Sequence, residues 1–152
     1  MRSRPPAPRT RNASTVPRSV ARLTNADYQR LARFRRSLRS FLHFSEEAAR
    51  DAGLTAAQHQ LLLAVKGFDG PGQPSIGDAA EWLRLKHHSA VELVDRAEAA
   101  GLLARVADPD DGRRQRLRLT AEGETRLARL SELHRAELRR FRDEVLEHLA
   151  PL

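Results

Sequence analysis

The sequence predicts a mainly α fold that carries one small β-hairpin, in the order α-α-α-α-β-β-α. Two observations predict it. After residue 86 a helical pattern of apolar side chains runs to Gly101, and two short runs follow, 102–106 and 116–119, joined by a turn rich in Asp, Pro, Gly and Arg. In addition, apolar side chains recur at helical spacing over a long segment near each end of the chain, which indicates two long helices.

The first long helix is expected over about residues 26–52. Gly53 follows it and suits the left-handed backbone that closes a helix. Thr55 has the side chain of an N-cap, so we predict a second helix from 56 to 67. A stretch rich in Gly and Pro, 69–74, then predicts a loop.

Ser75 predicts the start of a third helix, 76–83, because Asp78 stands at the third helical position and completes a capping box. The fourth helix is expected to run from about residue 86 to Ala100. After the hairpin, Thr120 is expected to cap the last helix, which continues to about residue 150. Its first turn contains acidic residues, whose negative charge is stabilised by the positive end of the helix dipole. The terminal helices are too long for a small domain to cover, so a second copy of the chain is the simplest partner for their apolar stripes. Phe141 is expected in that contact.

The charge of the chain is unevenly distributed. Its 152 residues carry a net charge of +7, but residues 1–22 contain six Arg and no acid. We therefore predict that 1–22 is a disordered Arg- and Pro-rich tail, either an auxiliary DNA-binding arm or an inert extension, and that 23–152 is a single, nearly neutral domain. A DNA-binding argument must rest on where the remaining arginines lie.

Composition excludes several classes of protein. The chain has no Cys, which removes disulfides, thiol sensing and Cys-type zinc sites, and no apolar run is long enough to cross a membrane. The N-terminus does not have the apolar segment of a secretory signal, so we expect a cytoplasmic protein. No catalytic motif is present, and the six His have no ligand spacing, so we predict no enzyme, no cofactor and no metal site.

A helix that leads into a basic two-stranded hairpin is the outline of a winged helix-turn-helix, here over about residues 55–120. In this class one helix enters the DNA major groove and the hairpin, called the wing, contacts the neighbouring groove. The turn at Asp110, Asp111 and Gly112 is a hairpin signal that places Arg113 and Arg114 at the wing tip.

The sequence resembles the multiple-antibiotic-resistance regulator (MarR) family of transcription factors. The wing matches the pattern D-x-R-x5-L-T at Asp111, Arg113, Leu119 and Thr120, followed by Glu122 and Gly123. The segments LTAAQHQLLLAV, SIGDAAEWL and LVDRAEAAGLLAR resemble the family's second, third and fourth helices. The resemblance implies a triangular homodimer whose terminal helices, about 26–52 and 121–150, form the dimerisation region. It also implies operator binding that a small ligand relieves.

The predicted DNA contacts come from helix starts and from the wing. Free N–H groups at helix starts favour phosphate oxygens, the first turns of the fourth helix meet base edges, and arginine suits a narrow minor groove. Asp111 is expected to orient Arg113, whereas Arg116 and Arg118 are interpreted as a solvated strand face. The predicted contacts are Ser75, Lys86, His87, His88, Ser89, Arg96, Arg113 and Arg114.

Glu92 departs from the family pattern, in which many members have a basic or hydroxyl residue at this position. An acid there repels phosphate. Glu92 can pair with Arg96 one turn further on, which is the interpretation we favour, or accept a hydrogen bond from a cytosine amino group. For the effector, we predict a pocket lined by His43, Phe44 and His59, between the long first helix, the second helix and the winged domain.

The function predicted is a homodimeric, sequence-specific DNA-binding transcriptional regulator that acts on a pseudo-palindromic operator in double-stranded DNA. We expect a repressor that a small-molecule effector relieves. Two alternatives remain open at this point. One is an architectural protein that binds DNA with little sequence preference, and the other is an interaction module whose DNA-binding face has decayed.

Overall fold

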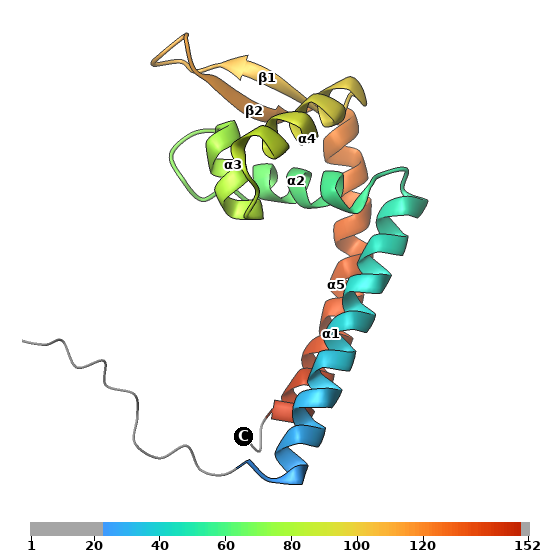
Figure 1. Ribbon diagram of the computed structural model, residues 1–152. Coiled ribbons are helices and arrows are strands. Elements are labelled where there is room, and N and C mark those ends of the chain that lie inside the picture. Colours follow the sequence, from blue (N-terminus) through green and yellow to red (C-terminus); the bar gives the residue numbers. More distant parts are fainter. Residues whose placement is uncertain (1–22, 150–152) are drawn as a thin grey trace, which may run out of the picture.

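The computed structural model describes residues 23–149 as five helices and one antiparallel hairpin, which confirms the predicted fold class and element order (Figure 1). Residues 1–22, predicted as a tail, lie outside the described residues. The elements are α1 (Asn25–Asp51), α2 (Ala56–Lys66), α3 (Ile76–Leu83), α4 (His87–Ala99), β1 (Leu103–Ala107), β2 (Gln115–Leu119) and α5 (Ala121–Leu149).

The molecule has two regions of different shape (Figure 1). Helices α1 and α5 run antiparallel and side by side, and together we call them the stem. Helices α2 to α4 and the hairpin form a compact group at one end of the stem, which we call the winged unit. In the hairpin Leu103 pairs with Leu119 and Ala107 with Gln115, so the turn that joins the strands forms its tip.

The helices α2, α3 and α5 begin after the capping residues that the sequence predicted. Thr55 and Ser75 form capping boxes, in which the hydroxyl accepts from a backbone N–H three residues later and the side chain there accepts from the cap's own N–H. Thr120 accepts from the N–H of Gly123 at 3.1 Å, which caps α5 as predicted. Gly53 has a φ of +73°, which agrees with its predicted role after α1. Arg84 ends α3 with a φ of 54°, an unusual conformation for a side chain other than glycine that the sequence did not indicate.

The core lies in the winged unit and continues into the adjoining end of the stem. Apolar side chains from the helices and from both strands, mostly leucines, are almost fully buried in it, and each large one contributes roughly 1.5–3 kcal/mol to folding. The largest of these side chains are Leu61, Leu62, Leu102, Leu103, Leu117, Leu130 and Val94. Because Leu130 belongs to α5, the last helix serves both regions.

The junction between the hairpin and α5 is very close. A Cβ on Gly123 would stand 1.9 Å from the carbonyl oxygen of Leu102, so only glycine fits there. That carbonyl also accepts from the N–H of Thr120 at 3.1 Å. Gly123, which belongs to the sequence pattern that suggested the family, therefore lets α5 start directly against the base of the wing.

Candidate nucleic-acid interface

Helix α4 exposes the face that would meet DNA. Ala90, Leu93, Val94 and Ala97 are buried, so they fix one side of the helix against the core. A side chain in the middle of the opposite side, Glu92, is exposed. The helix can therefore present its outer face to a groove without losing core packing.

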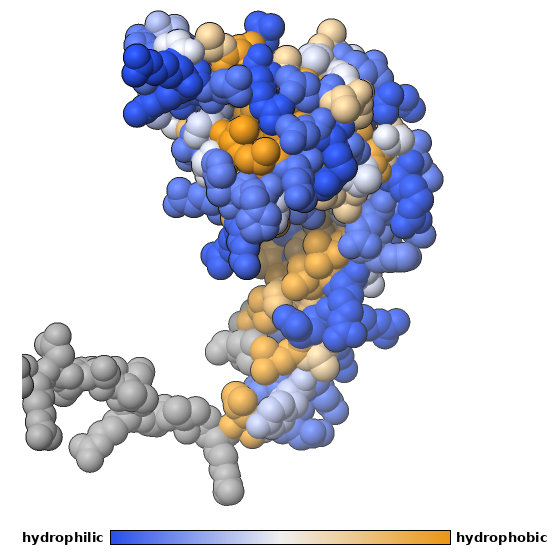
Figure 2. Space-filling model, turned by 45° about the horizontal axis from the view of Figure 1, so that its top comes forward, coloured by the Kyte–Doolittle hydropathy of each residue, from blue (hydrophilic) through white to orange (hydrophobic). Residues whose placement is uncertain are grey.

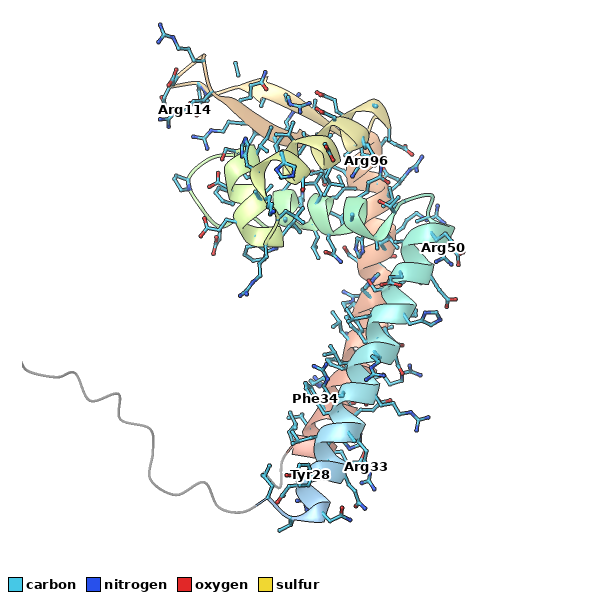
Figure 3. The ribbon with its side chains drawn as sticks, in the orientation of Figure 1. Tyr28, Arg33, Phe34, Arg50, Arg96 and Arg114 are labelled. Carbon is cyan, nitrogen blue, oxygen red and sulfur yellow. The ribbon has the colours of Figure 1, made fainter. Side chains whose placement is uncertain are left out.

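The predicted DNA contacts on α4 differ in their exposure to solvent. His87, His88 and Arg96 are exposed, and Lys86 is an exposed N-cap whose side chain makes no capping hydrogen bond. Ser89 is half-buried. Arg96 lies far from the wing tip, which is marked by Arg114, so these residues would reach separate parts of a DNA site (Figure 3).

The starts of α3 and α4 and the wing meet around one open groove of about 580 Å³. It is lined by Ser75, Ile76, Gly77, Asp78, His87, Arg113, Arg114, Gln115 and Arg116. Four residues predicted separately as DNA contacts, from three different segments, are thus brought to one place. A phosphate backbone that follows this groove would lie among arginine side chains and near the N-terminus of α3.

Ser75 uses its own polar groups within the protein. Its hydroxyl and its N–H both donate to Asp78 Oδ2 at 2.7 Å, and the hydroxyl accepts from the Asp78 N–H. These hydrogen bonds lower the pKa of the Asp78 carboxyl, the backbone one contributing most. The donors left at this helix start are therefore the N–H groups of Ile76 and Gly77, which have no helical acceptor.

The wing tip carries the exposed Arg113 and Arg114. Asp111 was expected to orient Arg113, and its carboxylate accepts from the Arg113 backbone N–H at 3.1 Å. Its other oxygen lies 3.4 Å from Nε of Arg114, whose side chain extends away from the body of the protein (Figure 3). Asp111 thus contacts both arginines, one through the backbone and one through the side chain.

Arg116 is not the solvated strand residue that the sequence suggested. It is half-buried and donates from Nε to Asp108 at 2.5 Å and from its guanidinium to the carbonyl oxygen of Gln73 at 3.1 Å. Asp108 is buried, and the backbone N–H of Asp110 and then the Arg116 side chain hold the pKa of its carboxyl below the usual range. Arg116 therefore fixes the wing against the segment before α3, whereas Arg118 is exposed as expected.

A second arginine connects the base of the wing to α4. Arg105 on β1 donates through its backbone N–H and its guanidinium to Glu98, and its guanidinium also donates to Asp95. The backbone hydrogen bond from Arg105 is the main reason that the pKa of Glu98 is lowered. Two of the acids of α4 are thereby neutralised. Sequence reasoning missed this contact, because no local pattern couples a strand residue to the preceding helix.

Glu92 is not paired as we had favoured. No ion pair between Glu92 and Arg96, or between Glu92 and any other residue, forms within residues 23–149. The i, i+4 spacing permits the pair, but it adds only about 0.2–0.5 kcal/mol on an exposed helix face. The carboxylate is left on the outer face of α4.

A largely apolar pocket of about 690 Å³ lies where the stem meets α2. It is lined by Phe41, Leu42, Ser45, His59, Gln60, Leu63, Ser131, His134, Arg135, Leu138, Arg139 and Arg142. Of the predicted effector residues, His59 is buried in this lining. His43 is exposed and lies 3.4 Å from Glu47, and Phe44 lines a separate, smaller hollow of the stem.

Two buried histidines meet at the base of this pocket. The rings of His59 and His134 are 4.7 Å apart, although the residues are 75 positions apart in the chain. His134 Nδ1 lies 2.7 Å from the carbonyl oxygen of Leu130 and Nε2 lies 2.8 Å from the Ser45 hydroxyl. Because a carbonyl only accepts, Nδ1 donates to the Leu130 oxygen, and Nε2 shares a hydrogen bond with the Ser45 hydroxyl. Burial, and then the neighbouring His134, lower the pKa of His59.

The stem exposes large side chains with apolar surface along its length, and Figure 2 shows orange, hydrophobic areas on it. These side chains are Tyr28, Leu31, Leu42, Leu133, Leu138 and Leu146. Leu42 and Leu138 border the pocket, so part of this apolar surface is continuous with it. Phe141, which we expected in a dimer contact, is half-buried and stacks on Phe41 of the same chain at 5.2 Å.

Two other kinds of site are not found in the described part of the chain. Among residues 23–149 no group of three or more His, Asp or Glu side chains could hold a metal ion. Within the same residues no helix has the length and apolarity needed to cross a membrane.

The fold and this groove define a winged helix-turn-helix protein. Residues 52–114 match the model of the MarR family, which confirms the resemblance inferred from the sequence motifs. No curated protein matches the chain. The match covers α2 to the wing tip, the part of the chain that contributes most residues to the candidate interface.

Several solved structures share the fold. AbsC, a MarR family transcriptional regulator from Streptomyces coelicolor, is 22% identical with a TM-score of 0.64, over 78% of this chain and 80% of its own. A point mutant of S. aureus MepR, bound to an oligodeoxyribonucleotide, is 19% identical with a TM-score of 0.62, over 76% and 82%. CouR from Rhodococcus jostii RHA1, bound to p-coumaroyl-CoA, is 21% identical with a TM-score of 0.59, over 73% and 85%.

Proposed function

We propose that this protein is a homodimeric transcriptional regulator that binds a pseudo-palindromic operator in double-stranded DNA. Helix α4 enters the major groove, while Arg113 and Arg114 of the wing contact the adjacent minor groove or its phosphates. The observation that carries the proposal is the single groove that unites the starts of α3 and α4 with the wing arginines. The fold shared with oligonucleotide-bound MepR supports it.

The homodimer is supported by the apolar surface of the stem. Leu42, Leu138 and Leu146 are each 46% or more exposed, and exposing several leucines on two adjacent helices to water is unfavourable. A second copy provides an identical surface, and pairing by a twofold axis covers both at once. Two winged units held in this way would read two half-sites about one helical turn of DNA apart.

A small effector is the natural ligand of the pocket between the stem and α2. Its volume and apolar lining suit an organic molecule, and its position between the two regions would let a ligand change how the winged unit is held against the stem. CouR, whose fold this chain shares, is bound to p-coumaroyl-CoA in its structure. We propose that such a ligand relieves DNA binding, which makes the protein a repressor.

Selection from a random DNA library tests the proposal. The regulator predicts enrichment of an inverted repeat with half-sites about one helical turn apart, and protection of both half-sites together in footprinting. Equal retention of all sequences would support the architectural alternative. Failure to bind any DNA at low salt would support the interaction module.

A further inference from the structure

We propose that Glu92 sets the base preference of α4 by accepting a hydrogen bond from the N4 amino group of a cytosine in the major groove. The inference rests on the proposed function, because it requires α4 to enter that groove. It assigns a specific base to a residue that departs from the basic or hydroxyl side chain expected at this position.

Glu92 lies near the start of α4, on the face of the helix that is exposed to solvent. The helix begins at His87, so Glu92 lies in the second turn, among the residues nearest to a groove that the helix start enters. Ala90 and Val94 are buried on one side of the helix, and Glu92 is exposed on the other. Its neighbours one turn away on the outer face are His88 and Arg96, both exposed.

The charges around α4 carry the second step. The other two acids of α4, Asp95 and Glu98, form ion pairs with Arg105 of β1, so their charge is compensated within the protein. Glu92 forms no ion pair within the described residues. An uncompensated carboxylate between two phosphate backbones is repelled, unless a hydrogen-bond donor on a base edge receives it.

The chemistry of the base edges carries the third step. A carboxylate only accepts, and the major groove offers it two donors, the amino groups of cytosine and adenine. The adenine amino group stands between N7 of its own ring and O4 of thymine, both of which are acceptors that repel a carboxylate. The cytosine amino group has a C–H group on one side, so cytosine is the base that Glu92 prefers.

Selection of binding sites by the full-length protein and by Glu92→Gln tests the assignment. Glutamine both donates and accepts, and it pairs with N6 and N7 of adenine. We expect the wild-type protein to require cytosine at one position of each half-site, and Glu92→Gln to lose that requirement or to change it to adenine. Glu132→Gln is the matched control, because it removes the same charge from an exposed position on α5 in the stem.

A second measurement uses the wild-type protein alone. Replacing the required cytosine by N4-methylcytosine puts a methyl group in place of the donor hydrogen, so affinity should fall on the order of tenfold. The same replacement should leave the affinity of Glu92→Gln nearly unchanged. Affinity of Glu92→Gln for random DNA should also rise several-fold at constant salt, because the repulsion from phosphate is removed.

The outcomes separate this inference from the proposed function. If the wild-type protein selects an inverted repeat and Glu92→Gln selects the same bases at every position, Glu92 reads no base and the inference is wrong while the regulator stands. An unchanged affinity for the N4-methylcytosine site leads to the same conclusion. If the wild-type protein selects no sequence, both proposals are wrong.

Discussion

The winged unit and the stem differ in how completely they bury their apolar side chains. In the winged unit, leucines from three helices and two strands close around a common core, and Leu62, Val94 and Leu117 are completely buried. In the stem, two long helices pack mainly against each other, and leucines such as Leu138 and Leu146 are left about half exposed. The first region therefore buries its apolar core within one chain, whereas the second leaves apolar surface exposed, which we propose a second copy covers.

The polar contacts show the same difference. Arg116 and Arg105 tie the wing to the segment before α3 and to α4, so the interface arginines Arg113 and Arg114 are carried on a fixed frame. The stem has mostly short-range ion pairs on its surface, such as the one between Arg126 and Glu122, each worth little. These ion pairs add little stability to the stem, and we propose that a second copy of the chain covers its exposed leucines.

The largest effect is expected where the two regions join. Gly123→Ala places a methyl group against the carbonyl oxygen of Leu102, at a distance that neither backbone can accept. We expect a loss of about 3 kcal/mol or more in unfolding free energy, measured by urea denaturation, since the clash involves backbone on both sides.

Gly112→Ala is the control, because no atom lies within 4 Å of a Cβ there. It should change unfolding free energy by less than about 0.5 kcal/mol. Equal stability of the two variants would show that α5 and the hairpin are not held as closely as described.

A charge on the apolar surface of the stem should have the next largest effect. Leu146→Asp removes an apolar contact and adds a carboxylate on both copies, so we expect the dimer dissociation constant to rise on the order of 100-fold or more. Sedimentation at several concentrations measures it.

Leu133→Asp tests which side of the stem is used. Leu133 is similarly exposed on α5 but lines the hollow with Phe44 and Glu47, about 140° around the helix from Leu138. It should leave the dissociation constant within a few-fold of the wild type. If Leu133→Asp dissociates the dimer and Leu146→Asp does not, the partner lies on the opposite side from the one proposed.

Loss of a wing arginine should affect DNA binding alone. Arg113→Ala should weaken binding to operator and to random DNA about tenfold at fixed salt, or to A·T-rich flanks preferentially if the side chain enters a narrow minor groove. The thermal midpoint and the dimer dissociation constant should not change, because Arg113 is exposed. Unchanged affinity for every DNA would mean that the wing does not touch DNA.

The smallest effect concerns pH and the histidines between the regions. Since the pKa of His59 is lowered in the folded protein, the unfolded chain binds more protons below about pH 6.5, and stability should fall as pH decreases through that value. The carboxyls of Asp78 and Asp108, whose pKa values are lowered, lose their contribution only at more acidic pH.

His59→Leu removes this titration, so its thermal midpoint should fall less than that of the wild type between about pH 7.5 and 5.5. His43→Leu is the control, because His43 is exposed on the stem and should keep the wild-type slope. Parallel slopes for all three proteins would show that the buried histidine does not determine this pH dependence.

Local signals predicted the fold well. Ser75 with Asp78 and Gly53 act within one helical turn, so a single sequence contains all that is needed to place those helix ends. The wing arginines were found in the same way, from the turn beside them. The bounds of α3 agree with the prediction residue for residue.

What the sequence did not reveal depends on pairs far apart in the chain. Arg116 on β2 contacts the carbonyl oxygen of Gln73, and His59 on α2 contacts His134 on α5 of the stem, and no periodicity in the sequence specifies either contact. A pocket lies between the stem and α2, the region in which the effector pocket was predicted, but His43 and Phe44 lie outside its lining because the rotation of α1 is set by its contact with α5.

The claim that the stem is completed by a second copy is tested most directly by the mass of the protein in solution. Light scattering of the full chain at micromolar concentration should give twice the chain mass of 17.1 kDa, and Leu146→Asp should shift that mass toward a single chain. A folded wild-type protein with the mass of one chain would contradict the account.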